Sequence, residues 1–403
     1  MTDSDAGLPK IGRRSFLWTA AFAAAAPIMS EATLAQARMS ALGKAPPPDA
    51  VLINANENPL GPSQAACEAI AQIAPTGGRY DRTNLGGEFV QTFAAQHNLK
   101  PENIAVYAGS SEPLHYTVLA FTSPSRGFVT ADPSYESGMV AAAVAQAPIH
   151  KVPLTASFAH DVKAMVAADP NAGVIYICNP NNPTGTVTPR QDILWALDNK
   201  PAGSILLVDE AYIHLSDEQD VLDMVTAGKD LIVLRTFSKV YGMAGIRCGL
   251  AIGRPDLLAK LQAYGQNSMP ITALAAAHAS LKDPDLVPTR KKIIGDTRRD
   301  TFAWLKANGY TVIGAPQSNC FMIDTGRNGH GVIAALQEKN VYIGRIWPVW
   351  PHAVRVSVGT PEDMAKFKLA FKDVMDKPAM ASLTGHRPAA YAPIGTGGST
   401  FLS

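Results

Sequence analysis

Short apolar runs alternate with longer segments of helical periodicity through the middle of the chain. Such runs are typical of strands buried on both faces, and the alternation predicts βαβ units with helices covering a mostly parallel sheet. The expected class is therefore α/β. The runs that we interpret as strands are 104–107, 127–130, 174–177, 205–208 and 231–234.

The pattern changes near residue 285, where a charged helical stretch at 290–306 leads to separated strand candidates at 319–324 and 354–358. This change predicts a small α+β domain after a larger α/β domain. The tail, rich in Ala, Pro, Gly and Ser, is predicted to be disordered. The predicted division is an N-terminal arm with part of the small domain (38–75), a large domain (76–284), a small C-terminal domain (285–376) and the tail (377–403).

The N-terminus has the pattern of an export signal. Arg13 and Arg14 stand before an apolar, alanine-rich run at 18–29, and small residues follow at 35–37. The run is short for a membrane-spanning helix. We predict a twin-arginine signal peptide over 1–37, which engages the twin-arginine export machinery and sends the folded protein to the periplasm. The alternatives are an uncleaved anchor or a basic N-terminus that arose by chance.

Composition narrows the class of protein further. The 403 residues are 47% hydrophobic and carry a net charge of +1, which supports a large core but gives no field that would attract nucleic acid or a membrane surface. We therefore expect no nucleic-acid partner and no stable membrane insertion. Cys67, Cys178, Cys248 and Cys320 are not spaced as a zinc site, so no metal is predicted. Cys178, Cys248 and Cys320 lie in or beside apolar runs, so inert buried thiols are the preferred interpretation, although a disulfide remains open.

Lys239 is the most informative candidate for chemistry. It follows the apolar run 231–234, and the end of a buried strand is where α/β folds place functional groups. A lysine there can form a Schiff base with an aldehyde cofactor. Ser238 and Arg247 could hold that cofactor's phosphate, with the arginine as a bidentate donor. The alternative is a solvated lysine at a strand end.

The stretch from Arg235 to Arg247 resembles the lysine motif of class I and II aminotransferases, which are pyridoxal phosphate (PLP) enzymes of fold type I. It is most similar to the histidinol-phosphate aminotransferase branch, and the resemblance runs from Asn54 to about Phe367. It implies a large domain with a mostly parallel seven-stranded sheet and a small α+β domain. It also implies that Lys239 holds PLP as an internal aldimine and is the catalytic residue.

The resemblance assigns three residues to the cofactor ring. Asp209 ends the run 205–208 and matches the carboxylate that pairs with the pyridine nitrogen, which keeps the ring an electron sink. Otherwise it would be an ordinary helix N-cap. Asn182, within the turn-forming stretch 179–185, and Tyr212 match donors to the cofactor's phenolic oxygen. Donors at this oxygen lower the pKa of the aldimine.

The same resemblance places further residues around the phosphate and the ring. Ser110 and Ser111 follow Gly109 and match a phosphate-binding pair, in keeping with the affinity of helix N-termini for anions. Tyr135 matches the aromatic side chain that stacks on the ring, or is a core tyrosine. Tyr80 matches a residue that reaches the phosphate of the neighbouring subunit. A homodimer is therefore expected, unless Tyr80 is only a surface residue.

On the substrate side, Arg355 matches the arginine that binds the α-carboxylate, a role that suits a planar guanidinium. Asn58 lies in the matching N-terminal segment that closes over the substrate. Arg345 corresponds to an arginine that helps bind the distal phosphate of histidinol phosphate. However, the segment 344–352 has two tryptophans and two prolines where the family has a glycine-rich turn. This departure and the export signal favour an aromatic or bulky amino acid over histidinol phosphate.

The expected reaction is transamination between an amino acid and a 2-oxo acid with ping-pong kinetics. PLP activates a carbanion but does not decide its fate. A decarboxylase, racemase, lyase or oxidase on the same fold therefore remains an alternative. A non-catalytic ligand-binding protein is a weaker one, because Lys239, Asp209, Asn182, Tyr212 and Arg247 are all present.

Overall fold

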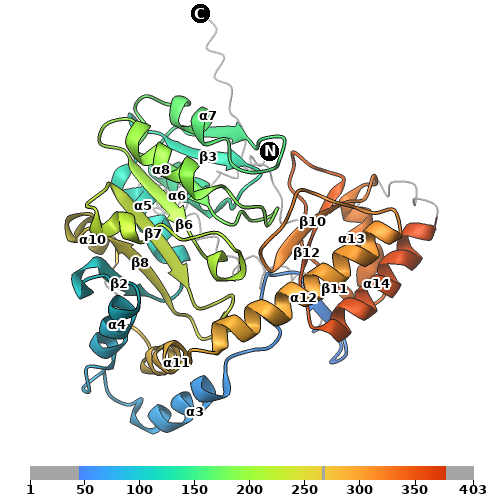
Figure 1. The fold of residues 1–403 in the computed structure, drawn as a ribbon, viewed down its shortest axis with the longest axis horizontal. Coiled ribbons are helices and arrows are strands. Elements are labelled where there is room, and N and C mark those ends of the chain that lie inside the picture. Colours follow the sequence, from blue (N-terminus) through green and yellow to red (C-terminus); the bar gives the residue numbers. More distant parts are fainter. Residues whose placement is uncertain (1–44, 266–267, 378–403) are drawn as a thin grey trace, which may run out of the picture.

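The computed structural model describes residues 45–265 and 268–377 (Figure 1). The predicted signal peptide lies outside the described residues, as does the predicted tail after Lys377. A large part built around one sheet stands beside a smaller part that contains its own strands (Figure 1). Within the described ranges, none of the helices combines the length and the apolar character that crossing a membrane requires.

The large part is built on a seven-stranded sheet with the order β2-β8-β7-β6-β5-β3-β4. Six of these seven strands point in the same direction, and β8 runs opposite to them. The predicted mostly parallel sheet is therefore confirmed. The strands are β2 (Ile104–Tyr107), β3 (Phe128–Asp132), β4 (Ile149–Pro153), β5 (Val174–Cys178), β6 (Ile205–Asp209), β7 (Leu231–Thr236) and β8 (Gly249–Gly253).

Alternate side chains of the central strands enter two separate hydrophobic clusters, one on each face of the sheet. Tyr176 and Leu207 pack in the cluster that includes buried residues of α5, α6 and α10. Ile175 and Leu206 pack in the other, with α4, α7, α8 and α11. Burial on both faces explains why these strands read as continuous apolar runs.

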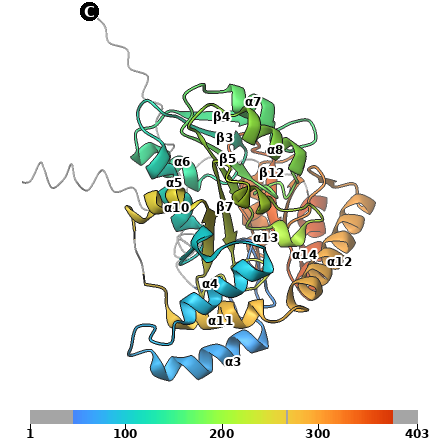
Figure 2. The ribbon, with the colours of Figure 1, turned by 60° about the vertical axis from the view of Figure 1, so that its left-hand side comes forward.

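Helices complete both parts of the molecule. Helix α3 lies against α11 at the edge of the large part (Figures 1 and 2). The helices of the large part are α3 (Gln64–Ile73), α4 (Leu85–Gln96), α5 (Ser111–Phe121), α6 (Ser137–Val144), α7 (Val162–Ala167), α8 (Arg190–Asn199), α9 (Asp223–Thr226), α10 (Pro255–Gln262) and α11 (Ile271–Leu281). They are followed by α12 (Leu286–Ala307), α13 (Gly329–Gln337) and α14 (Pro361–Asp376).

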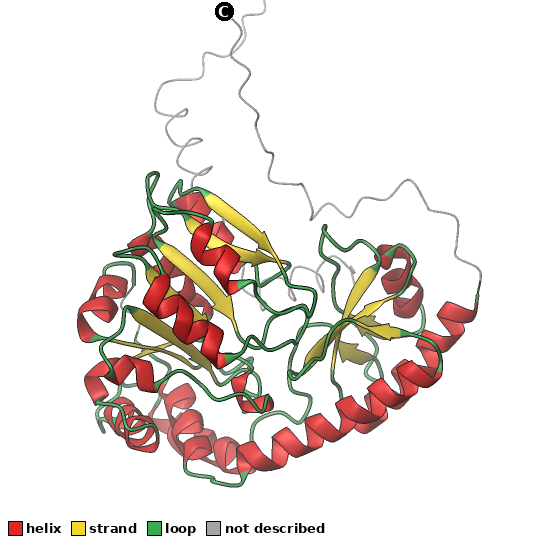
Figure 3. Cartoon of the chain, turned by 45° about the horizontal axis from the view of Figure 1, so that its top comes forward, coloured by secondary structure: helices red, strands yellow, loops and turns green. Residues whose placement is uncertain are grey.

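The small part contains two short sheets, and the long helix α12 leads into it from the large part (Figure 3). One sheet is antiparallel with the order β12-β10-β9, and in the other β1 pairs in parallel with β11. The N-terminal strand thus belongs with the C-terminal half of the chain. The strands are β1 (Val51–Ile53), β9 (Thr311–Val312), β10 (Cys320–Asp324), β11 (Val341–Ile343) and β12 (Ala353–Ser357).

The sheet topology brings the candidate residues together at one end of the strands. Strands β5, β6 and β7 are parallel neighbours, so the segments that leave their carboxyl ends, with Asn182, Asp209 and Lys239, emerge together. Because β8 is antiparallel, its amino end lies beside the carboxyl ends of the parallel strands and brings Arg247 there. The carboxyl end of the parallel strands is where α/β sheets bind their ligands.

Candidate active site

Lys239 lies inside the protein, with 8% of its surface exposed. Its Nζ donates a hydrogen bond to the backbone carbonyl oxygen of Asn56 at 3.0 Å and lies 5.4 Å from the centre of the Tyr212 ring. A lysine held among buried groups differs from the solvated lysine that was the alternative interpretation. Its amino group therefore lies where burial shields it from bulk water.

Asp209 is buried at the end of β6. Burial raises the pKa of its carboxyl group to about 6, while the Tyr176 hydroxyl, the Ala211 backbone N–H and the charge of Lys239 oppose this rise. Tyr176 donates to Oδ2 at 3.0 Å, and the Ala211 N–H donates to Oδ1 at 3.1 Å. Asp209 is therefore a buried carboxylate poised to pair with a cation. Sequence reasoning missed Tyr176, because a tyrosine in an apolar strand resembles a core residue.

Asn56 lies at the centre of a hydrogen-bonded network that sequence reasoning also missed. Its Nδ2 donates to the Tyr212 hydroxyl at 3.1 Å. Its backbone N–H donates to Ser357 Oγ at 2.8 Å, and that hydroxyl donates to Asn56 Oδ1 at 3.1 Å. Asn319 Nδ2 donates to the Asn56 carbonyl oxygen at 3.1 Å. The backbone of Asn56 has a φ of 53°, a left-handed conformation that Asn tolerates better than most residues. The only signal in the sequence was therefore the asparagine itself.

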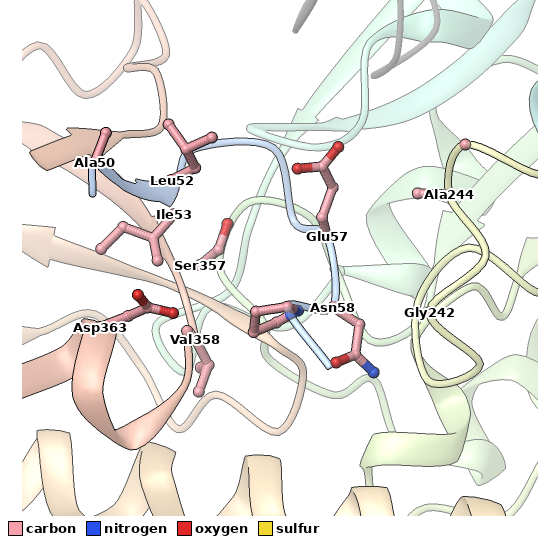
Figure 4. Close-up of a pocket in the computed structure, with 13 residues that line it drawn as sticks. Ala50, Leu52, Ile53, Glu57, Asn58, Gly242, Ala244, Ser357, Val358 and Asp363 are labelled. Carbon is pink, nitrogen blue, oxygen red and sulfur yellow. The ribbon is translucent and has the colours of Figure 1, made fainter. Parts of the chain in front are cut away.

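Asn58, the predicted substrate neighbour, makes different contacts. Its Nδ2 donates to the Val240 carbonyl oxygen at 3.0 Å, and its Oδ1 accepts from the Leu60 N–H at 3.1 Å. Together with Glu57, Asn58 lines a pocket of about 380 Å³ between the N-terminal segment, the loop at Gly242 and the small part (Figure 4). Lys239 does not line this pocket. Asn58 thus ties the N-terminal segment to the chain immediately after the lysine.

A candidate anion site forms beside α5. Ser110 is the N-cap of this helix and Ser111 its first residue. Arg247 donates to the Ala108 carbonyl oxygen at 3.0 Å, and its Nη1 lies 3.4 Å from Ser238 Oγ. A Cβ added at Gly109, which has a φ of +98°, would lie 2.1 Å from Arg247 Nη2. Glycine is therefore required for the guanidinium to approach the helix N-terminus.

Arg355 joins the two parts of the protein. Its Nη1 donates to Asn182 Oδ1 at 2.9 Å, and its Nη2 donates to the Asn54 carbonyl oxygen at 2.8 Å. The side chain is buried. Asn182 leaves β5 of the large part, whereas Arg355 lies on β12 of the small part. The predicted carboxylate-binding arginine is thus adjacent to a predicted cofactor-binding residue.

Arg345 is buried, and its guanidinium carbon lies 4.1 Å from the centre of the Trp347 ring. It forms an ion pair with Glu136, the N-cap residue of α6. Trp347 is fully buried, and its Nε1 donates to the Ser134 carbonyl oxygen at 3.1 Å. The segment 134–136 of the large part therefore contacts the tryptophan-containing segment of the small part. Sequence reasoning gave no role to Glu136.

Tyr135 and Tyr80, two of the three predicted site tyrosines, lie in contrasting environments. Tyr135 is buried next to the Trp347 contact, as expected for a residue near the cofactor ring or in the core. Tyr80 is 86% exposed. A side chain exposed to this extent in one chain is compatible with a contact to a second subunit. Its predicted role remains a prediction.

The arrangement fits PLP in its chemistry. The helix N-terminus, Ser238 and Arg247 offer donors suited to a phosphate, and the approach at Gly109 leaves no space for a side chain. The buried carboxylate of Asp209 suits a protonated ring nitrogen. Lys239 supplies the amine for a covalent bond to an aldehyde.

The family model and the relatives found by comparison with known proteins are all aminotransferases. The family model for aminotransferase class I and II matches residues 48–368. The chain is 30% identical over 335 residues to a histidinol-phosphate aminotransferase from Moorella thermoacetica, covering 81% of this chain and 86% of that protein. It is 33% identical over 335 residues to an aromatic amino acid aminotransferase from Rhodococcus erythropolis, covering 81% of this chain and 90% of that protein.

The fold also matches solved structures. Histidinol-phosphate aminotransferase from Sinorhizobium meliloti in complex with pyridoxal-5'-phosphate superimposes with a TM-score of 0.78. The match covers 92% of this chain and 99% of that chain, at 22% sequence identity. At this identity the match establishes the fold. The predicted PLP-dependent transferase fold type I is confirmed.

Proposed function

Because this chain belongs to the aminotransferase class I and II family, whose cofactor is PLP, we propose that it transfers an amino group between an amino acid and a 2-oxo acid by a ping-pong mechanism. The family supports the enzyme class and the cofactor. The observation that carries the proposal is the convergence of Lys239, Asp209 and Arg355. Asp209 ends β6 and Lys239 follows β7 in the large part, whereas Arg355 lies on β12 of the small part.

Each residue has a chemical task in this proposal. When bound, PLP supplies an electron sink for the α-carbon and carries the amino group between the two substrates. Ser110, Ser111, Ser238 and Arg247 hold the phosphate. Lys239 anchors the cofactor and then moves the substrate's α-proton. Arg355 binds the α-carboxylate and orients the amino acid toward Lys239.

Further predicted contacts complete the proposed site. Asp209 keeps the ring nitrogen charged, Asn182 and Tyr212 contact the phenolic oxygen, and Tyr135 stacks on the ring. The hydrogen bond from Arg355 to Asn182 supports this assignment, because the residue proposed to bind the substrate is adjacent to one proposed to bind the cofactor. Asn56 bonds both Tyr212 and Lys239 and is proposed to position them.

The first experiment is to record the visible absorption spectrum of the purified protein while single amino acids are added without an oxo acid. Conversion of the yellow cofactor band to the pyridoxamine form would establish half-transamination and identify the donor class. Release of CO₂ without an acceptor, or racemisation, would instead favour one of the alternative PLP reactions. A protein that stays colourless after addition of PLP would overturn the proposal.

Replacing the lysine provides a second test. Lys239→Ala should abolish turnover, since a single general acid–base residue contributes roughly 10²–10⁴-fold and this one also anchors the cofactor. Lys229→Ala is a suitable control because Lys229 is a solvent-accessible residue that pairs with Asp198. Substantial activity of Lys239→Ala would refute the assignment.

The amino donor is proposed to have an aromatic or other bulky side chain. The relatives include aromatic amino acid aminotransferases as well as histidinol-phosphate aminotransferases. Trp347 is buried in an apolar cluster against which Trp350 packs, and its ring contacts Arg345. The same spectral titration, with histidinol phosphate and phenylalanine as donors, separates these possibilities.

Export to the periplasm is proposed from the twin-arginine pattern at Arg13 and Arg14. This pathway carries folded proteins, so PLP would be loaded in the cytoplasm before export. Changing both arginines to lysine should retain the protein in the cytoplasm, as measured by cell fractionation. Unchanged location would argue against this route.

The active unit is proposed to be a homodimer in which Tyr80 reaches the partner subunit's cofactor phosphate. Its 86% exposure in the single chain supports this arrangement. Sedimentation should give a dimer, and Tyr80→Phe should weaken PLP binding without changing the fold. A catalytically active monomer would contradict the proposal.

A further inference from the structure

We propose that Glu136 determines specificity by neutralising Arg345, so that the site selects amino acids with uncharged side chains. The inference rests on the proposed function, because it concerns the side-chain end of the same substrate site. It assigns a role to a residue outside the predicted site.

The first support is the contact between Glu136 and Arg345. Glu136 Oε2 forms an ion pair with Arg345 Nη1, and the side chains are 31% and 4% exposed, respectively. The carboxylate is thus the more accessible member of the pair. The guanidinium, by contrast, is buried against the Trp347 ring.

The second support is continuity with the proposed carboxylate site. The Arg345 carbonyl oxygen accepts a hydrogen bond from the Arg355 N–H at 3.2 Å. Both guanidinium groups lie over Trp347, at 4.1 Å for Arg345 and 5.5 Å for Arg355. The side chain of an amino acid held by Arg355 would therefore lie close to Arg345 and Glu136.

The third support comes from the location of Glu136 in the chain. It directly follows Tyr135, the predicted ring-stacking residue, and the carbonyl oxygen of Ser134 accepts from Trp347 Nε1. The backbone that presents Glu136 is therefore held against the same tryptophan. This contact holds the segment that carries Glu136 close to the tryptophan that both arginines contact.

The charges explain the selection. Without the Glu136 carboxylate, the positive charge of Arg345 would attract a distal carboxylate or phosphate, as arginines do in sites for anionic ligands. With Glu136 present, an anionic side chain must displace a carboxylate that already holds the arginine, and it meets repulsion from that carboxylate. An uncharged side chain requires no such exchange. This is selection by disfavouring the wrong ligand.

The test uses two unreactive acids with the same five-carbon main chain, 4-methylpentanoate and glutarate, which differ in an isopropyl group against a carboxymethyl group. Their affinities for the PLP-loaded protein are measured by isothermal titration calorimetry. The wild-type protein should bind 4-methylpentanoate more tightly. Glu136→Gln should shift the affinity ratio toward glutarate by about tenfold or more, since close charge pairs at interfaces couple at least this strongly. Glu362→Gln, at an exposed site on α14, should leave the ratio unchanged.

Two results would overturn the inference. One is a wild-type protein that binds glutarate as tightly as 4-methylpentanoate, a measurement that does not depend on any variant folding. The other is a folded Glu136→Gln protein with an unchanged ratio. Failure of the proposed transamination is distinguished by the spectral titration, in which no amino acid would convert the cofactor, whatever the ratio of the two affinities.

Discussion

Lys239 Nζ donates a hydrogen bond to the backbone carbonyl oxygen of Asn56, at 3.0 Å and across 183 residues of sequence. Asn56 follows β1, which pairs with β11 in the small part, whereas Lys239 follows β7 of the large part. The hydrogen bond therefore connects the candidate catalytic lysine to the small part. A shift of the small part relative to the large sheet would therefore change the hydrogen bond made by Lys239.

Asn56 offers a matched pair of variants. Asn56→Gly removes the side-chain bonds to Tyr212 and Ser357 but tolerates the φ of 53°. It should lower the free energy of unfolding by about 1–3 kcal/mol, because buried partners lose their hydrogen bonds. Asn56→Ala loses the same bonds and adds strain of about 1–2 kcal/mol in the left-handed region. Urea unfolding should rank wild type above Gly above Ala; a more stable Ala variant would contradict this account.

The anion site beside α5 depends on Gly109. Gly109→Ala would place a Cβ 2.1 Å from Arg247 Nη2 at a φ of +98°, so the guanidinium must move away from the helix N-terminus. We expect PLP affinity to fall by about tenfold or more, the equivalent of one charge-assisted hydrogen bond. Absorbance titration of the cofactor-free protein measures this. Gly331→Ala is the control, because a Cβ there meets nothing within 4 Å. Equal PLP affinity of both variants would remove the phosphate site from this location.

Asp209 should make the stability of the cofactor-free protein depend on pH. Burial raises its pKa from 3.8 to about 6, so the folded protein retains this proton at a pH where the unfolded chain releases it. The stabilisation is fully present below about pH 4 and is lost as the pH rises to about 6, with a slope of about 1.4 kcal/mol per pH unit.

Two variants isolate this contribution. Asp209→Asn should lack this slope, so the difference in unfolding free energy between wild type and variant should change by about 1.4 kcal/mol per pH unit across the window. Tyr176→Phe removes a hydrogen bond that stabilises the carboxylate, so the window should extend to higher pH. Urea unfolding at a series of pH values gives both curves. A wild-type curve that runs parallel to that of Asp209→Asn would mean that the carboxyl group titrates normally.

The buried ion pair between Arg235 and Glu210 offers a stability test. Arg235 Nε donates to Glu210 Oε2 at 2.9 Å, and its Nη2 donates to Asp220 Oδ2 at 2.6 Å. Arg235→Met leaves the Glu210 carboxylate buried without its partner and should cost about 3–5 kcal/mol. Adding Glu210→Gln should recover part of this loss. Arg254→Met, at a more exposed pair with Asp230, should cost no more than about 1 kcal/mol in urea unfolding. Equal costs at both sites would contradict the prediction.

The strands of the sheet were predictable to different extents. Predicted runs 104–107, 174–177 and 205–208 match β2, β5 and β6 to within one residue, because burial on both faces demands continuous apolar sequence. Strands β4 and β8 were not identified from the pattern. Strand β4 lies at the edge and exposes most of its residues, and β8 begins and ends with glycine. Neither strand is a continuous run of large apolar residues, which is the feature from which the other strands were predicted.

The sequence by itself determined the local chemistry: Lys239 and Asp209 at the ends of apolar strands, Ser110 and Ser111 at a helix start, and the family motifs that connect them. These features depend on neighbours in the chain, so they are readable without a structure. Only the tertiary structure decided that Asn56 bonds Lys239, that Tyr176 donates to Asp209 and that Glu136 pairs with Arg345. Such contacts join distant segments, and their partners are chosen by strand order and by the packing of the small part against the large one.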